Sequence, residues 1–132
     1  MAKKEIINPG WSHYETLTFS PAVKKGNLIF VAGMGGTEYD PAQSKVVVRG
    51  DIVEQIRLAY QKVKTVLEAA GATMEDVVKT TEYITTDENY RATAPVRREF
   101  FQDGFPAATG VIVKSLLHPG MLIEVDVIAM VG

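Results

Sequence analysis

The chain has no cysteine, and its 132 residues include only two histidines and one tryptophan. The absence of cysteine excludes disulfide bonds, thiol catalysis and thiolate ligands for a metal. His13 and His118 are too few for a histidine-rich metal site. The sequence therefore predicts a protein without a bound metal, and nothing in it calls for another cofactor.

Long apolar runs and an excess of charge are also missing. No apolar run approaches the ~20 residues of a membrane-spanning helix. Residues 1–4 lack the apolar segment of a signal peptide, so a cytoplasmic location without a membrane partner is expected. The net charge is −2, with both signs mixed along the chain, which gives no basic face for nucleic acid. With 46% hydrophobic and 23% charged residues, the sequence predicts one globular domain spanning residues 1–132.

The clearest predicted element is a helix over residues 51–70. Apolar residues recur there every three or four positions, which indicates one buried face. Asp51 and Glu54 have the spacing of a capping box, and Gly71 is placed to end the helix. The buried face has to pack on a sheet, and Tyr60 within that face is interpreted as a core residue.

Several shorter elements complete the predicted order, strand-strand-strand-helix-strand-helix-strand-strand. Residues 38–41 are interpreted as a loop, and a second helix is expected after Thr93 with Pro95 in its first turn. This order predicts an α+β fold in which two helices cover one face of a mixed, mostly antiparallel sheet. The predicted strands, rich in β-branched and aromatic residues, are 5–8, 16–23, 28–32, 76–86, 111–113 and 121–131.

Acidic residues on the predicted strands are the first candidates for chemistry. Glu124 and Asp126 are two positions apart and therefore face the same side of the last strand. They form either the solvated face of a half-buried strand or an acid in a cleft that transfers protons, and the sequence leaves both open. Glu82, on the strand over 76–86, is expected to be solvated.

Two further stretches have alternative interpretations. The loop over 10–15 contains Trp11, His13 and Tyr14, and is either anchored by one buried aromatic residue or faces a ligand. The glycines at 33, 35 and 36 match neither phosphate-binding glycine motif. Close packing of the backbone against a neighbouring group is the preferred explanation for them.

The C-terminal stretch resembles the signature of the Rid family, the RidA/YjgF-like reactive intermediate deaminases. The family pattern is F-P-A-R-S-x-V-x-V, a turn, and then I-E-I-E-A-I-A. This chain has FPAATGVIV at 105–113 and LIEVDVIA at 122–129, and further matches extend the resemblance over residues 20–131. The resemblance implies a chorismate-mutase-like fold, a homotrimer with clefts at its subunit interfaces, and hydrolysis of small imines and enamines such as 2-aminoacrylate.

The resemblance also assigns roles to single residues. Glu124 is the implied proton carrier. The family arginine that binds the substrate carboxylate falls on Ala108, so the chain resembles a divergent member that lacks this arginine. A small polar or thiol position falls on Gly110, and a tyrosine position falls on Phe19. The implied substrate-binding residues are Phe19, Ser20, Ala32, Gly33, Met34, Ala108, Thr109 and Gly110.

The expected function is that of a hydrolytic deaminase or a related hydrolase acting on a small imine or enamine. The missing arginine leaves three alternatives open. The substrate can lack a carboxylate and occupy a more apolar pocket, or Arg91, Arg97 or Arg98 can replace the missing cation. The third alternative is a non-catalytic, trimeric small-molecule-binding or regulatory protein. A ribonuclease activity associated with the family is disfavoured because the chain has no basic face.

Overall fold

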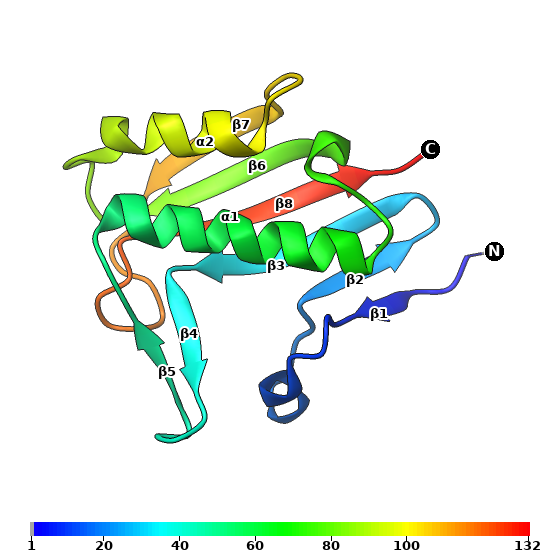
Figure 1. Cartoon of the computed structure of the whole chain (residues 1–132), viewed down its shortest axis with the longest axis horizontal. Coiled ribbons are helices and arrows are strands. Elements are labelled where there is room, and N and C mark those ends of the chain that lie inside the picture. The colour runs from blue at the N-terminus through cyan, green and yellow to red at the C-terminus, as the bar shows by residue number, and fades with distance from the viewer. Residues whose placement is uncertain (1) are drawn as a thin grey trace.

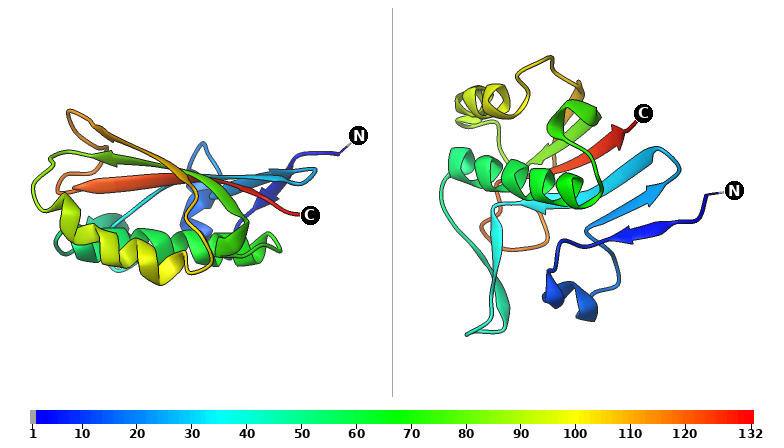
Figure 2. Two further views of the ribbon diagram at one scale, coloured as in Figure 1. Left: turned by 90° about the horizontal axis from the view of Figure 1, so that it is seen from above. Right: turned by 45° about the vertical axis from the view of Figure 1, so that its right-hand side comes forward.

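The computed structural model describes residues 2–132, which form a six-stranded sheet with two helices on one of its faces (Figure 1 and Figure 2). The strand order in the sheet is β1-β2-β3-β8-β6-β7. A two-stranded hairpin, β4–β5, extends away from this sheet (Figure 1). The strands are β1 (Glu5–Ile7), β2 (Ala22–Lys25), β3 (Leu28–Gly35), β4 (Thr37–Asp40), β5 (Lys45–Val48), β6 (Val77–Ile84), β7 (Ala107–Ile112) and β8 (Ile123–Met130).

Neighbouring strands of the sheet are antiparallel, except that β6 and β7 are parallel. The predicted α+β class and mixed sheet are therefore confirmed. β7 and β8 follow one another in the chain but are not neighbours, because β6 lies between them. The turn before β8 is closed by a hydrogen bond of 3.2 Å from the Met121 N–H to the His118 carbonyl.

Helix α1 (Ile52–Ala69) confirms the clearest prediction from the sequence. The Asp51 carboxylate accepts from the Glu54 N–H at 2.9 Å, and the Glu54 carboxylate accepts from the Asp51 N–H at 3.2 Å, which completes the capping box. Gly71 ends the helix at a φ of +81°, where a side chain would be strained. Tyr60 and the other apolar residues of one helix face are buried against the sheet.

Two predictions from local sequence are wrong. Of residues 38–41, expected to form a loop, the first three belong to β4, which pairs with β5 as a hairpin. Only residues 22–23 of the strand expected over 16–23 enter β2. Thr16 is the last residue of a 3-10 helix, η1 (Ser12–Thr16), and residues 17–21 form neither helix nor strand. Asn8 helps to fix η1, because its side-chain oxygen accepts from the Trp11 N–H at 2.7 Å. Local strand propensity is outweighed there by these turn contacts.

The second helix, α2 (Ala94–Phe100), begins after a 3-10 turn, η3 (Tyr90–Thr93), and has Pro95 in its first turn as expected. Glu82 holds this region to the sheet, and the expectation that Glu82 is solvated is wrong, because only 3% of the residue is exposed. Arg97 donates two hydrogen bonds to its carboxylate, and the hydroxyls of Tyr60 and Tyr90 donate one each.

The electrostatics of Glu82 follow from these contacts. Burial alone would raise the pKa of Glu82, but the hydrogen bonds from Arg97, Tyr60 and Tyr90 outweigh burial and lower it. The carboxylate is therefore a charged structural group whose acceptor capacity is used by three side chains. Because Arg97 is committed to Glu82, it is not available as a substitute for the missing arginine. No helix in residues 2–132 is long and apolar enough to cross a membrane.

Candidate functional site

Glu124 is placed by the alternation of side chains along β8. Ile123 and Val125 point into the core and are fully buried, whereas Glu124 and Asp126 lie on the opposite face and are partly exposed. In the sheet register, Glu124 is opposite Gly35 on β3 and Tyr83 on β6. The predicted shared face of the two acids is thus confirmed, and Asp126 is held there by a 2.8 Å hydrogen bond from the Tyr83 hydroxyl.

Gly33 explains how the Glu124 side chain is accommodated. A β-carbon built at Gly33 would overlap the Glu124 carboxylate, so the carboxylate lies directly against the backbone of β3. The pairing of β3 with β8 also shifts register between Val31 and Met34, as it does at a β-bulge. The glycine cluster is therefore a place of close packing, with Gly33 against Glu124 and Gly36 against Gln55 of α1.

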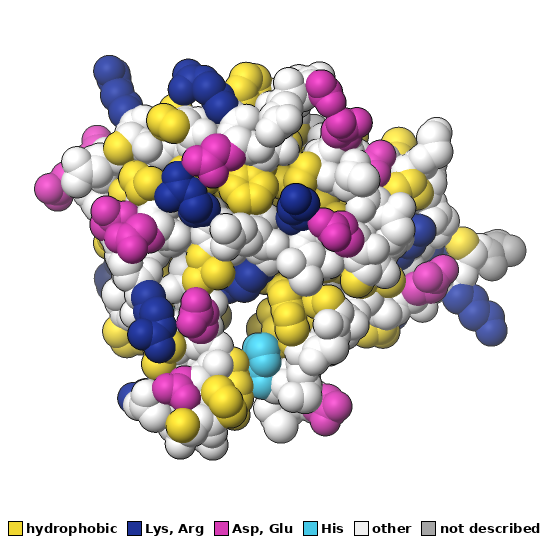
Figure 3. Space-filling model, viewed as in Figure 1, with side chains coloured by type: hydrophobic (Ala, Val, Ile, Leu, Met, Phe, Trp, Pro, Cys, Tyr) yellow, Lys and Arg dark blue, Asp and Glu magenta, His cyan; other side chains and the backbone are white. Residues whose placement is uncertain are grey.

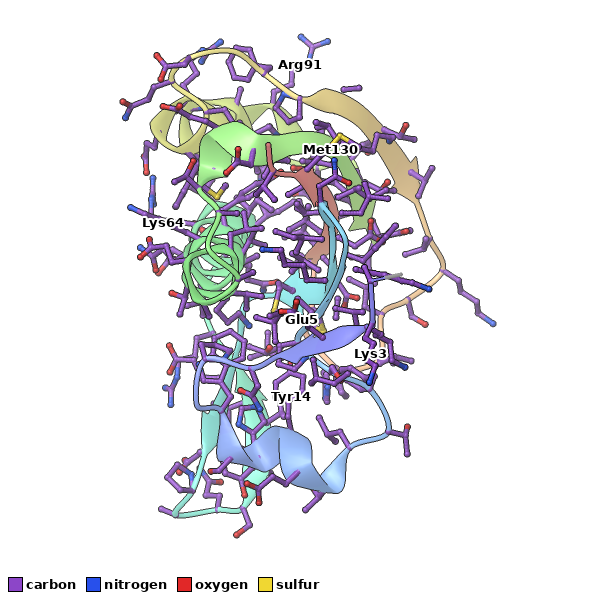
Figure 4. The ribbon with its side chains drawn as sticks, turned by 90° about the vertical axis from the view of Figure 1, so that its right-hand side faces the viewer. Lys3, Glu5, Tyr14, Lys64, Arg91 and Met130 are labelled. Atoms are coloured by element: carbon purple, nitrogen blue, oxygen red, sulfur yellow. The ribbon has the colours of Figure 1, made fainter. Side chains whose placement is uncertain are left out.

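The Glu124 side chain faces a hollow of about 350 Å³, called here the Glu124 cavity. His13, Tyr14 and Phe19 from the N-terminal segment line it, together with His118 from the turn before β8. In Figure 4 the segment that carries Tyr14 lies beside the β4–β5 hairpin. The cavity falls within the ~300–1,000 Å³ range of pockets that bind small molecules.

The pKa of Glu124 is raised, first by burial and then by the negative charge of Asp126. The positive charges of His118 and Lys62 oppose this rise. No hydrogen bond from residues 2–132 contributes to the shift. A carboxyl group with a raised pKa and no such partner is suited to give and take protons closer to neutral pH than an ordinary glutamate.

A second hollow, the Lys62 cavity, adjoins the first and has a volume of about 530 Å³. The two cavities share His13, Tyr14, Thr37 and Val46 in their walls. The combined opening lies between the β4–β5 hairpin and η1, where Figure 3 shows a hollow with a histidine at its edge. The His13 ring stacks on Tyr39 of the hairpin, with ring centres 4.7 Å apart.

Lys62 extends from α1 into the wall of its cavity. Its Nζ donates to the Thr37 carbonyl at 2.8 Å and to the Thr37 hydroxyl at 3.0 Å. Burial lowers the pKa of Lys62 to about 8, against the charges of Glu124 and Glu38, which favour the protonated form. The sequence by itself does not single out Lys62. The one signal it offers is the place of Lys62 at the border of the buried stripe of α1, next to Val63.

The structure brings together only some of the predicted substrate-binding residues. Phe19, Ala32 and Gly33 line the Glu124 cavity. Ser20 does not line this cavity but lines another hollow together with Phe19 and Ala32, and Met34 is buried in the core.

Ala108, Thr109 and Gly110 lie apart from these residues, on the exposed strand β7. β6 lies between β7 and β8, and Gly110, the nearest of the three to Glu124 in register, is opposite Glu82, which pairs with Val125. Within one protomer, therefore, these three residues do not meet Glu124.

The loop over residues 10–15 is anchored by a partly buried aromatic residue, as one of its two interpretations expected, and the ligand-facing interpretation stays a prediction. Trp11 packs against the core, and His13 and Tyr14 line both cavities. Of the arginines considered as substitutes, Arg91 and Arg98 are exposed, and neither lines a cavity wall described above. No group of three or more histidine, aspartate or glutamate residues in the described part of the chain could hold a metal ion.

Solved structures of other proteins have the same fold as this chain. The structure is similar to that of a YjgF/YER057c/UK114 family member from Mycobacterium tuberculosis, with a TM-score of 0.80, 30% identity, and coverage of 98% of this chain and 100% of the other. The architecture is thus the chorismate-mutase-like α+β fold of YjgF proteins.

Sequence comparison extends this result. A RutC family protein of Pyrococcus abyssi is 40% identical over 111 residues, or 84% of each chain. A 2-iminobutanoate/2-iminopropanoate deaminase of Dermatophagoides farinae is 34% identical over 116 residues, or 88% of each. The family model described as endoribonuclease L-PSP matches residues 13–131. The chain therefore belongs to this family, which includes the Rid and RutC proteins.

Proposed function

We propose that the protein hydrolyses the C=N bond of a small imine, or of the enamine in equilibrium with it, in the Glu124 cavity. The observation that carries this proposal is a half-buried carboxyl group with a raised pKa that faces a cavity of small-molecule size. The similarity to a relative named as an imine deaminase supports the same reaction class.

The reaction needs only water and one group that carries protons. Glu124 donates a proton to the imine nitrogen, and its carboxylate then accepts a proton from the water that attacks the imine carbon. The same carboxyl group then protonates the nitrogen of the resulting carbinolamine. As the C–N bond breaks and ammonia leaves, the Glu124 carboxylate accepts the hydroxyl proton, which gives the ketone and restores the carboxyl group. The sum is imine plus water giving ketone plus ammonia, so no oxidant or further reactant is required.

We also propose that three copies assemble, with the clefts at their interfaces. The sheet face opposite the helices carries exposed apolar side chains, among them Ile6, Phe30 and Met130, whose burial would favour association. In such an assembly, β7 of a neighbouring copy would bring its Ala108 to Gly110 segment to the cleft. That arrangement would unite the predicted substrate-binding residues that a single protomer keeps apart.

The alternative is a trimeric protein that binds a small molecule or regulates without turnover. Ala108 is the observation that favours it, because the family arginine that binds the substrate carboxylate is absent from that position. The two functions differ in one measurable respect. Only the hydrolase requires Glu124 to change its protonation state.

The test compares two acids of the same strand face. Glu124→Gln keeps the shape of the side chain and removes proton transfer, so turnover should fall by about 10²–10⁴-fold with an unchanged melting temperature. Asp126→Asn should reduce turnover much less, because Asp126 acts on Glu124 only through its charge. The substrate is 2-iminobutanoate generated by an amino acid oxidase, and the readout is the rate of ammonia release above the uncatalysed rate.

Two results would overturn the proposal. Wild-type protein that leaves the uncatalysed rate unchanged, with imines both with and without a carboxylate, would favour the binding protein. If Asp126→Asn abolished turnover and Glu124→Gln preserved it, the proton carrier would have been assigned to the wrong acid.

A further inference from the structure

Lys62 presents a partly buried positive charge without a direct anionic partner. No carboxylate in residues 2–132 comes within 4.0 Å of its Nζ, whereas the described ion pairs involve only arginines. Glu38, which acts on Lys62 at longer range, is instead paired with Arg49 at 3.4 Å. Charges removed from water are normally paired. An anion that enters the cavity can supply the pairing that is missing here.

The hydrogen bonds of Lys62 leave room for such a partner. An ammonium group has three donors, and two of them are directed to the carbonyl and hydroxyl oxygens of Thr37. These two bonds fix the ammonium at the first residue of β4. One donor remains for an anion in the Lys62 cavity, whose volume and aromatic walls fit a small organic molecule.

The position of Thr37 connects this charge to the proposed reaction. Thr37 lines both cavities, so the Lys62 ammonium is held where the two hollows adjoin. The charges of Lys62 and Glu124 act on one another, but the two groups form no ion pair. A small molecule can therefore place an anionic end near Lys62 and its reacting carbon near Glu124.

We propose that Lys62, held by Thr37, forms an anion-binding subsite that receives the carboxylate of a small 2-imino acid while its C=N carbon lies at Glu124. The inference rests on the proposed function and deepens it by naming the residue that binds the substrate carboxylate. It also assigns the missing cation to a residue of α1 rather than to β7 or to Arg91, Arg97 or Arg98. A substrate that carries a carboxylate can then still be bound, although position 108 is alanine.

The test uses 2-oxobutanoate, the ketone product, as a stable charged probe and its amide as the uncharged equivalent. Lys62→Met should weaken binding of 2-oxobutanoate by about 10- to 100-fold and leave binding of the amide nearly unchanged. Lys62→Gln, which keeps a hydrogen bond to Thr37 without the charge, should show the same loss. Lys64→Met is the matched control, because Lys64 is exposed on the solvent side of the same helix (Figure 4). Melting curves establish that each variant is folded.

Two further readouts separate a binding role from a structural one. In steady-state kinetics with 2-iminobutanoate, Lys62→Met should raise KM far more than it lowers kcat. In wild-type protein, affinity for 2-oxobutanoate should fall as the pH rises through about 8, where Lys62 loses its proton, and this step should be absent in Lys62→Met. His13, Glu38 and Glu124 also face the surroundings of Lys62. The pH dependence of 2-oxobutanoate affinity is therefore measured on Glu124→Gln as well, which identifies the contribution of Glu124.

The outcomes distinguish this inference from the proposed function. Equal loss of acid and amide binding in Lys62→Met, or no loss of either, overturns the subsite even if turnover depends on Glu124. Charge-selective loss in Lys62→Met, with no turnover in wild-type protein, supports the subsite and assigns it to a binding protein instead.

Discussion

Two arginine–glutamate pairs in this protein have the same fork geometry but very different burial. Arg97 donates to Glu82 through Nε at 2.9 Å and Nη2 at 2.5 Å, and Arg57 donates to Glu99 through the same atoms at 3.2 and 2.8 Å. The side chains of Glu82 and Arg97 are 4% and 19% exposed, whereas those of Glu99 and Arg57 are 48% and 39% exposed. The two pairs therefore test how burial sets the energy of an ion pair.

Glu82→Gln should destabilise the protein far more than Glu99→Gln. The first change leaves the Arg97 guanidinium without its anion in a buried site, and breaking a buried pair in this way costs about 3–5 kcal/mol. The tyrosine hydroxyls that bind Glu82 would also face an amide in place of a carboxylate. The exposed pair is screened by water, so Glu99→Gln should change the stability little.

The assay is urea unfolding of both variants at one protein concentration, because the proposed assembly would make the midpoint concentration-dependent. The pKa of Glu82 is lowered on folding, so its contribution is present above the unfolded pKa of ~4.3 and is lost as the pH falls through the folded value. The difference between wild type and Glu82→Gln should accordingly shrink in acid. Equal losses of stability for the two variants at neutral pH would refute the reasoning from burial.

The remaining predictions concern Gly33 and the assembly. Gly33→Ala should fold and lose turnover, because the added β-carbon displaces the flexible Glu124 carboxylate. Gly36→Ala should mainly lower the melting temperature, because the added β-carbon meets the Gln55 Cα at 2.7 Å. Turnover and melting curves on both variants check this, and full activity in Gly33→Ala would contradict it. Light scattering should give a mass of about three times 14.4 kDa, and a monomer at micromolar concentration would remove the basis for interface clefts.

Elements with a strong internal period can be predicted from the sequence. The buried apolar face of α1 and its capping box depend on neighbours three and four positions away in the sequence. The alternation of side chains along β8 is enough to place Glu124 and Asp126 on one face. The β4–β5 hairpin escapes such prediction because its strands are only four residues long and β4 carries two acids and a tyrosine that also suit a loop.

Contacts between residues far apart in the chain explain the other errors. Glu82 resembles a solvated acid in the sequence because nothing beside it neutralises it, whereas its donors Tyr60, Tyr90 and Arg97 come from α1, η3 and α2. Lys62 escapes prediction for the same reason. Its partner Thr37 is 25 positions away, and a single lysine at the border of a helix stripe ordinarily reaches into solvent.

The two ends of the candidate site have different properties. At one end the Glu124 carboxylate contacts the backbone at Gly33, and at the other Lys62 donates hydrogen bonds to Thr37. Glu124 is fixed against the backbone of β3, so the proton carrier has little freedom to move toward that side. Lys62 is a compact charge with donors that rotate, unlike the planar fork of an arginine. A lysine therefore attracts a carboxylate without fixing its plane, and orientation at that end has to come from Thr37 and the aromatic walls around His13. Binding of the substrate carboxylate by Lys62, as proposed, would make substrate selection depend on the shape of the cavity in place of one bidentate contact from an arginine.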